Sequence, residues 1–276
     1  MLSKRYLAIK SFLTKVSKIE VLHKRIRVLA QLYIDIDKGF RFSYLPDENG
    51  EIELLQTLNK LYNGKLIYFD VGAHLGTYTD MIVDGFEDYD GHLFEISNRT
   101  FEKCVERLGG NPRLTINSLG LSDSTGEVEI RYYPDDPTRN GIAGVAAEAN
   151  FTYEIHKAQC TTGSMYCREK NIDHIDFLKI DAEGYDFHVL KGFDELLTKN
   201  AIDVIQFEYN FRHGDVHVAM RDFNEYLTSH DYQIGALRQS GVEFKAFEPQ
   251  DNSFERGPNF IACRQDLCDA LRYFKL

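Results

Sequence analysis

The feature that most constrains the fold of this sequence is an alternation of short apolar runs and helix-forming segments that begins near residue 64. The apolar runs have the length of buried strands, and the segments between them carry the three-and-four spacing of amphipathic helices. Repeated strand–helix units predict a parallel sheet with helices on both faces. The expected strands are residues 66–70, 91–95, 113–118, 176–181, 201–208, 232–237 and 259–264, and the expected helices are residues 75–85, 97–108, 186–197 and 215–229.

The end of the chain departs from this alternation. A polar loop with Pro249 and Pro258, and no helix, separates the last two expected strands, so these strands should pair antiparallel. The expected fold class is therefore α/β, with a doubly wound, mostly parallel, seven-stranded Rossmann-like sheet. Residues 123–172 interrupt the rhythm with strand-like runs at 126–133 and 152–159. We expect this insertion to shape a substrate site.

Charge is distributed unevenly along the 276 residues. The chain has 32 Lys and Arg against 43 Asp and Glu, a net charge of −11, but residues 1–30 hold eight basic residues and one acid, a net charge of +7. Residues 31–276 therefore carry −18. An acidic body repels phosphate, which excludes a globally basic nucleic-acid-binding protein, and no nucleic-acid partner is expected.

The basic N-terminal segment has helical periodicity, because its apolar residues recur every three or four positions on one stripe of a long helix. Three interpretations stay open: a helix that packs on the domain or forms a homodimer, an interfacial helix on an anionic membrane, and a basic targeting segment. The expected organisation is a helical extension and lead-in over residues 1–63 and one domain over residues 64–276. The stripe comprises Leu2, Tyr6, Ile9, Leu13, Val16, Ile19, Leu22, Ile26 and Leu29.

Cysteine usage and hydropathy indicate the compartment. The five cysteines are an odd number without a Cys-x-x-Cys pair, which favours free thiols in a reducing cytosol over disulfides or a zinc site. The N-terminus lacks the apolar core of a cleaved signal peptide, and no apolar stretch approaches the ~18 residues of a spanning helix. We therefore expect a cytoplasmic protein, with membrane association through the N-terminal helix as the alternative.

A glycine-rich turn, Asp-Val-Gly-Ala-His-Leu-Gly over residues 70–76, directly follows the first strand. Gly72 and Gly76 permit a tight turn and a close approach of the backbone to a ligand. The turn leads into a helix N-terminus, whose amides favour a negative group. The Gly-x-x-x-Gly spacing departs from the Gly-x-Gly-x-x-Gly dinucleotide fingerprint, which weakens a pyrophosphate-binding interpretation.

Glu95 ends the second strand, 23 residues after Gly72. An acid about 20 residues after a glycine turn can accept hydrogen bonds from both ribose hydroxyls in nucleotide-binding sheets. The turn and Glu95 together predict nucleoside binding.

Acids also follow the later strands. Asp181 and Glu183 follow one strand, and Glu208 ends the next, with His213 shortly after it. Because the carboxyl ends of parallel strands face the ligand crevice, these groups should lie close to the glycine-rich turn. Such a cluster suits a cationic ligand or a metal. The three acids could supply oxygens to Mg²⁺, which needs only one or two carboxylates, but nothing in their spacing demands it, and no metal ligand is assigned.

The chain resembles the FkbM-type class I methyltransferases over about residues 64–265. The resemblance rests on the segments DVGAHLGTYT, the FE at Glu95, LSDSTGEV, FLKIDAEGYDFHVLKG and IQFEYN, of which LKIDAEGYDFHVLKG is the most specific. His74 stands where the family more usually has asparagine, and Ile96 stands where it often has proline.

The resemblance implies a methyltransferase fold, S-adenosylmethionine as the donor, and O-methylation of a hydroxyl on a sugar, glycan or secondary metabolite. A sulfonium donor is cationic, which suits an acidic crevice. Transfer from it is an in-line displacement, so the protein mainly aligns the acceptor and removes its proton. The expected donor-binding residues are Asp70, Gly72, His74, Gly76, Tyr78, Thr79, Glu95 and, near the adenine, Ser122 and Asp123. The expected base is Asp181 or Glu183, and next Glu208 or His213.

Two other functions stay open from the sequence alone. The missing dinucleotide fingerprint argues against a nicotinamide-dependent oxidoreductase. A non-catalytic nucleoside-binding module is opposed by the intact acids at the strand ends. The acceptor site depends on residues 134–172 and 209–215, which contain no recognisable motif.

Overall fold

The computed structural model describes residues 10–15, 20–37, 45–147, 151–253 and 259–274. Its contacts divide the chain into two units, residues 1–43 and residues 44–276. Each unit is described by itself below.

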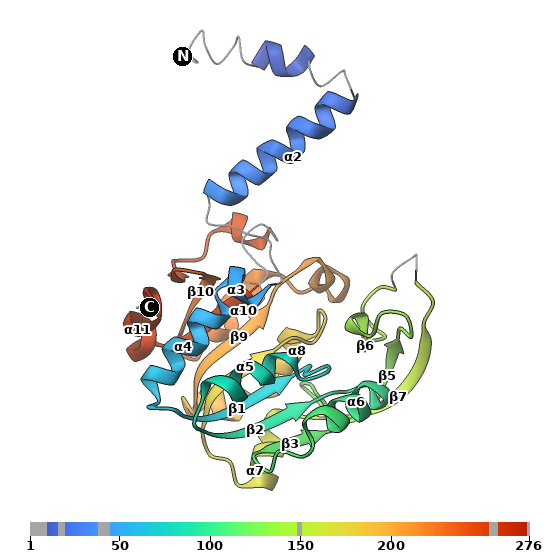
Figure 1. Cartoon of the computed structure of the whole chain (residues 1–276), viewed down its shortest axis with the longest axis vertical. Coiled ribbons are helices and arrows are strands. Elements are labelled where there is room, and N and C mark those ends of the chain that lie inside the picture. The colour runs from blue at the N-terminus through green and yellow to red at the C-terminus, as the bar shows by residue number, and fades with distance from the viewer. Residues whose placement is uncertain (1–9, 16–19, 38–44, 148–150, 254–258, 275–276) are drawn as a thin grey trace. The chain divides into compact units, whose positions relative to one another are not determined.

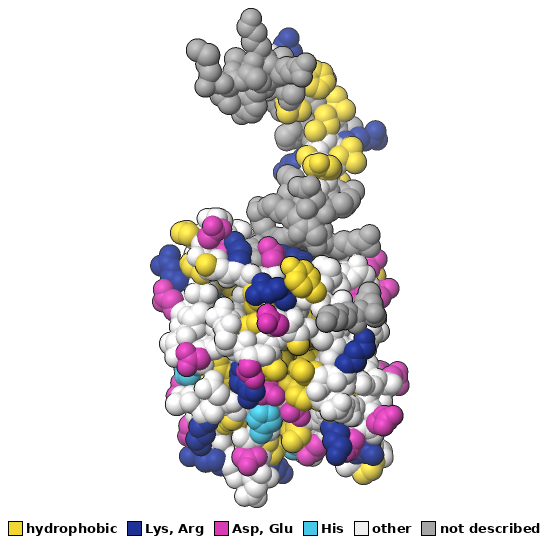
Figure 2. All heavy atoms as spheres, turned by 90° about the vertical axis from the view of Figure 1, so that its left-hand side faces the viewer, with side chains coloured by type: hydrophobic (Ala, Val, Ile, Leu, Met, Phe, Trp, Pro, Cys, Tyr) yellow, Lys and Arg dark blue, Asp and Glu magenta, His cyan; other side chains and the backbone are white. Residues whose placement is uncertain are grey.

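The first unit is helical where it is described. Residues 10–15 are helical, and helix α2 spans Glu20–Asp37. Leu22, Leu29 and Tyr33 are exposed on this helix, and Figure 2 shows hydrophobic side chains gathered along it with Lys and Arg side chains beside them. The predicted helix is thus confirmed over these segments and continues past residue 30, whereas its parts at residues 1–9 and 16–19 lie outside the described residues. None of the described helices has the length and hydropathy of a bilayer-spanning segment.

The second unit is built on an eight-stranded sheet with the order β11-β10-β12-β9-β8-β1-β2-β3 (Figure 1). Strands β8, β9, β1, β2 and β3 run parallel, β12 is antiparallel to both of its neighbours, and β11 is antiparallel to β10. The strands are β1 (Lys65–Val71), β2 (Asp88–Phe94), β3 (Leu114–Asn117), β8 (Ile175–Ile180), β9 (Ile202–Glu208), β10 (Tyr232–Arg238), β11 (Gly241–Phe244) and β12 (Asn259–Arg264).

The α/β class and the mostly parallel, doubly wound sheet are confirmed, but the strand count of seven is wrong. The eighth strand, β11, lies in the segment that the sequence assigned to a polar loop. Its pairing with β10 places Val242 opposite Leu237, and Val242 is buried. Gln239 and Ser240 form the turn between the two strands, and Gly241, with φ 144°, begins β11. A four-residue strand with only two apolar side chains, Val242 and Phe244, is too short for its period to be detected.

Helices cover both faces of the sheet, because adjacent residues of a strand point to opposite sides. Tyr68 packs in one core with α4 (Glu51–Leu61), α5 (Thr77–Gly85), α6 (Asn98–Leu108) and α11 (Cys268–Arg272). Its neighbour Phe69 packs in the other core with α7 (Gly163–Lys170), α8 (Asp186–Lys191), α9 (Asp194–Thr198) and α10 (Met220–Ser229). The short helices are α3 (Pro46–Asn49), η1 (Pro137–Arg139), η2 (Phe211–Val216), η3 (Pro249–Asn252) and η5 (Gln265–Leu267).

Two expected helices are divided in the structure. The segment 186–197 forms α8 and α9, because the chain turns at Gly192, which caps α8. The segment 215–229 begins within the 3₁₀ helix η2 and continues only from Met220 as α10.

The compact unit begins before the boundary that the sequence placed at residue 64. Helix α4 belongs to it, because Leu54, Leu55 and Leu58 are buried in the core shared with the sheet. Burying side chains of this size stabilises a fold by about 1.5–3 kcal/mol each.

The predicted insertion supplies three strands of a second, four-stranded sheet with the order β4-β7-β5-β6, and β4 lies just before the insertion. Its strands are β4 (Gly120–Leu121), β5 (Gly126–Tyr132), β6 (Gly141–Ile142) and β7 (Glu154–Thr161). All five cysteines are buried free thiols.

We expect deletion of residues 1–43 to leave the remaining unit folded and its ligand affinity unchanged, because both of its cores consist of residues after 43. Thermal melting and ligand titration of the truncated chain measure this. Loss of the folded state would contradict it. Sedimentation of the full chain and flotation with anionic vesicles then distinguish a dimerising helix from a membrane-binding one.

Candidate active site

A cleft of about 830 Å³ opens at the carboxyl ends of the parallel strands. Its wall combines the turn after β1, Glu95 after β2, Asp181 and Glu183 after β8, and Glu208 after β9. The convergence that the sequence predicted is therefore present in the structure. The insertion adds residues 137–142 to the wall, and the segment before the sheet adds Asn49 and Glu51.

The turn after β1 requires glycine at position 72. Gly72 has φ 81°, and a Cβ atom there would lie 1.8 Å from the carbonyl oxygen of Asp181. The amides of Gly72 and Ala73 both donate to the carbonyl oxygen of Phe94, at 2.9 and 3.0 Å. The turn is thus locked to both neighbouring strand ends, which presents its backbone to the cleft. Gly76, with φ 76°, caps helix α5 without lining the cleft.

Asp70 lies behind this wall. It is fully buried, accepts a hydrogen bond from the Thr79 hydroxyl at 3.0 Å and lies 3.4 Å from the Lys179 ammonium. Asp70 and Thr79, both expected to bind the donor, are not part of the cleft wall. In this structure they support the turn and hold Lys179.

Glu95 lies beside the turn, where two backbone amides hold its carboxylate. Its Oε2 accepts from the amide of His74 at 2.9 Å, and its Oε1 accepts from the amide of Ser97 at 2.8 Å. Burial raises its pKa to about 7 despite these two hydrogen bonds. Each oxygen keeps one lone pair for a further donor, so the carboxylate is oriented to accept two hydroxyls from the cleft.

His74 has a positive φ of 51°, a conformation that strains a non-glycine residue. Burial lowers the pKa of its imidazole, which favours the neutral form. The ring lies in the cleft wall, and its Nε2 has no hydrogen-bond partner among the described residues.

Lys179 is the central residue that the sequence analysis missed. Its ammonium lies 3.4 Å from Asp70, 3.5 Å from Asp181 and 5.0 Å from the ring centre of Tyr78. Burial alone would lower its pKa, but the surrounding carboxylates raise it, so the lysine stays charged. A lysine between Leu178 and Ile180, in the apolar second half of the strand, was the signal available in the sequence.

Glu183 and Glu208 form the acidic part of the cleft beyond Lys179. Glu183 has φ 51°, and its carboxylate lies 3.3 Å from Nε of Arg212. Burial, followed by the nearby charge of Asp181, raises the pKa of Glu183 to about 8. The same two causes raise the pKa of Glu208 well above its ordinary value.

Three further predicted site residues, His213, Ser122 and Asp123, do not line the cleft. His213 is fully buried, with its Nε2 3.4 Å from Asp186 and its ring against Tyr209 and Phe223. A base must reach the proton that it removes, and this buried position does not favour the expected role of His213 as a base, which stays a prediction. Asp123 is paired with Lys191 at 2.6 Å, and Ser122 lies beside it. The adjacent residues 119–121 line the cleft instead.

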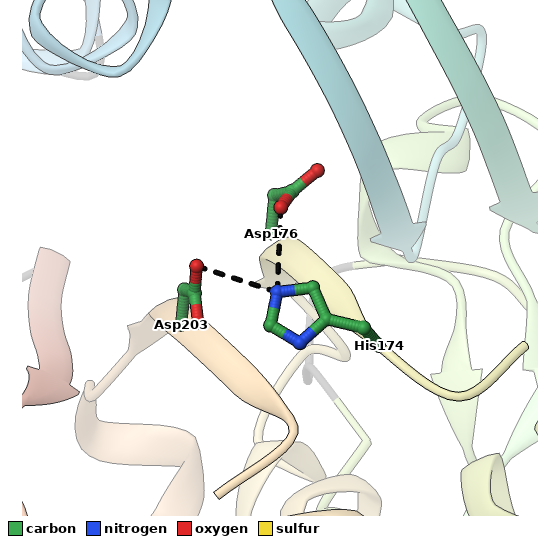
Figure 3. Close-up of side chains that lie close together, drawn as sticks. All are labelled: His174, Asp176 and Asp203. Atoms are coloured by element: carbon green, nitrogen blue, oxygen red, sulfur yellow. Dashed lines mark ion pairs between the residues drawn. The ribbon is translucent and has the colours of Figure 1, made fainter. Parts of the chain in front are cut away.

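A separate cluster lies at the opposite, amino ends of the strands. His174 lies 3.4 Å from Asp176 and 3.3 Å from Asp203 (Figure 3). Among the residues that the structure describes, these three, and not the acids of the cleft, bring ligand atoms within 4.8 Å of one another. Asp203 already contacts Arg264 at 2.9 Å and the Tyr62 hydroxyl at 2.9 Å, so its charge has partners within the protein.

The chain is similar to known methyltransferases. The Methyltransferase FkbM domain profile matches residues 70–234. The chain is similar to the hexuronic acid methyltransferase AglP of Haloferax volcanii, with 25% identity over 154 residues that cover 55% of this chain and 60% of the relative. The chain therefore spans less than two thirds of that relative's length.

Solved methyltransferase structures are similar at low identity. Methyltransferase FkbM of Methylobacillus flagellatus aligns with 16% identity and a TM-score of 0.45, covering 72% of this chain and 44% of the other. The N-methyltransferase NodS of Bradyrhizobium japonicum aligns with 11% identity and a TM-score of 0.39, covering 79% and 97%. The profile match spans more than half of the sequence, and on that basis the chain belongs to the FkbM methyltransferase family.

Proposed function

We propose that the protein transfers a methyl group from S-adenosylmethionine to a hydroxyl of a sugar. The observation that carries the donor assignment is Glu95, whose carboxylate is fixed by the amides of His74 and Ser97 and faces the cleft beside the glycine turn. This arrangement suits the two ribose hydroxyls of a nucleoside. Family membership weighs against the oxidoreductase alternative, and turnover distinguishes an enzyme from a non-catalytic binding module.

The donor's adenosine would be held at the β1–β2 side of the cleft. Glu95 would accept from the ribose, the backbone of Gly72 to His74 would approach the donor closely, and residues 119–121 would flank the adenine. The donor, when bound, supplies a methyl group that is already activated by its positive sulfur. The cleft's acids complement that charge.

Glu183 is the base that the geometry favours. A pKa of about 8 lies close to neutral pH, where a general base is most effective. Asp181 is held beside Lys179, and burial raises the pKa of Glu208 well above its ordinary value. Glu183 would take the proton of the acceptor hydroxyl as that oxygen receives the methyl group from the donor's sulfur.

The acceptor side of the cleft is polar and includes cations. Arg139 and Asn140 come from the insertion, and Asn210 and Arg212 come from the segment after β9. Amide and guanidinium groups suit the hydroxyls of a sugar, and the guanidinium groups also suit a carboxylate. The similarity to a hexuronic acid methyltransferase supports an acidic sugar as the acceptor.

Labelled S-adenosylmethionine tests this proposal with glucuronate-containing and neutral oligosaccharides as acceptors. We expect label in the acidic oligosaccharide as a methyl ether, which resists mild alkali and is located by mass spectrometry. Label released by mild alkali would indicate a carboxyl ester and contradict hydroxyl methylation. Label on nitrogen would contradict it as well.

A further inference from the structure

The cleft contains a buried carboxylate that comes from outside the βα units of the sheet. Glu51 is the first residue of α4, is 7% exposed and lines the cleft. Gly50, which precedes it, has φ 96°, and a Cβ atom there would lie 2.4 Å from the carbonyl oxygen of Arg238. The start of α4 is therefore held against the end of β10, which fixes the position of Glu51.

Neutral amides hold the carboxylate of Glu51. Its Oε2 accepts from Asn49 Nδ2 at 2.9 Å, and its Oε1 accepts from Gln206 Nε2 at 2.6 Å and from Asn259 Nδ2 at 3.2 Å. Gln206 in turn accepts from the Tyr78 hydroxyl at 2.9 Å. The three donors to the carboxylate come from α3, β9 and β12, and Tyr78 of α5 holds one of them, so three separate elements converge on one carboxylate.

The partners fix the carboxylate without neutralising it. Amides donate hydrogen bonds but carry no charge, and burial raises the pKa of Glu51 above its ordinary value. The nearby Lys179 pairs with Asp70 and Asp181. Burying an ionised carboxylate costs free energy unless a cation lies beside it. Its place in the cleft wall allows a ligand to provide that cation.

The location of Glu51 indicates which cationic group a ligand would place beside it. Glu51 is hydrogen-bonded to residues of β9 and β12, whereas Glu95 follows β2, with β8 and β1 between them in the sheet. The two acids therefore mark opposite sides of the cleft. The proposed donor has matching groups, because its ribose hydroxyls and the α-ammonium of its methionine portion lie on opposite sides of its sulfur.

We propose that Glu51 binds the α-ammonium of the methyl donor. This inference rests on the proposed use of S-adenosylmethionine and adds a specificity-determining residue to that site. Glu51 would select ligands that carry the amino-acid portion over nucleosides that lack it. The segment before the sheet thereby becomes part of the donor site.

Calorimetry with two ligands tests the proposal: S-adenosylhomocysteine, and its analogue that lacks only the α-amino group. We expect the wild-type protein to bind the analogue about 10- to 100-fold more weakly, which is the effect of one lost charged hydrogen bond. The Glu51→Gln variant should bind S-adenosylhomocysteine more weakly than the wild type by a similar factor. Its affinities for the two ligands should then lie within about threefold of each other. Asp47→Asn, an exposed acid on α3, is the matched control and should keep the wild-type difference.

The outcomes separate the inference from the proposed function. Equal wild-type affinity for the two ligands would overturn the role of Glu51, and so would a Glu51→Gln variant that keeps the full difference. The comparison of the two ligands uses only wild-type protein, so it tests the selection for the α-ammonium even if the variant does not fold. A wild-type protein that binds neither ligand would instead overturn the use of S-adenosylmethionine, and the inference would fall with it.

Discussion

Replacing Glu183 by glutamine is expected to lower kcat by about 10²- to 10⁴-fold, the usual contribution of a general base. The amide keeps the shape of the side chain but cannot take the acceptor's proton. Donor affinity should change little, because the turn and Glu95 are untouched. Steady-state kinetics and calorimetry measure the two quantities. Glu106→Gln, an exposed acid on α6, should show wild-type kinetics.

The pH dependence of kcat provides a second test of Glu183. Only the ionised form of Glu183 accepts a proton, and its pKa is raised to about 8. The wild-type kcat should therefore increase as the pH rises and level off above about pH 8. The residual activity of Glu183→Gln should lack this rise. A rise that persists in the variant would assign the base to another group, with Asp181 as the next candidate.

Gly72→Ala is expected to abolish donor binding and to lower stability. The new Cβ atom would lie 1.8 Å from the carbonyl oxygen of Asp181, and the residue would have to keep φ 81° or move. Both the backbone strain and the displacement are unfavourable, and we expect a loss of about 3 kcal/mol or more in the free energy of unfolding. For a domain of this size that corresponds to a Tm lower by roughly 6–12 °C.

Gly85→Ala is the matched control for this substitution. Gly85 is the last residue of α5, and a Cβ atom there would meet nothing within 4 Å. Alanine also restricts the unfolded chain, so Gly85→Ala should be neutral or slightly stabilising. A Gly72→Ala variant that melts and binds like Gly85→Ala would contradict the requirement for glycine at the turn.

The features that the sequence predicted well are those that local chemistry determines. The apolar runs and the turn residues identify the strands, and parallel order then brings Glu95, Asp181 and Glu208 to one edge. The order of the strands therefore locates the cleft, independently of any side-chain contact. It also gave the antiparallel pairing of the last two expected strands, which the structure confirms.

The features that the sequence did not reveal depend on contacts between distant segments. Glu51 joins the cleft only because α4 packs on the sheet, and Arg212 reaches it only because η2 follows β9 closely. Conversely, Asp70 and His213 have the right chemistry and sequence position, but strand alternation and helix packing turn both away from the cleft. One-dimensional spacing identifies the edge on which a residue lies and not the direction in which it points.

Titration with S-adenosylhomocysteine, with NAD in parallel, tests most directly the claim that the cleft is a methyl-donor site. We predict saturable heat with S-adenosylhomocysteine at micromolar concentrations, none with NAD, and loss of the S-adenosylhomocysteine signal in Gly72→Ala. The absence of heat at high micromolar S-adenosylhomocysteine, or tight binding of NAD in its place, would contradict the assignment.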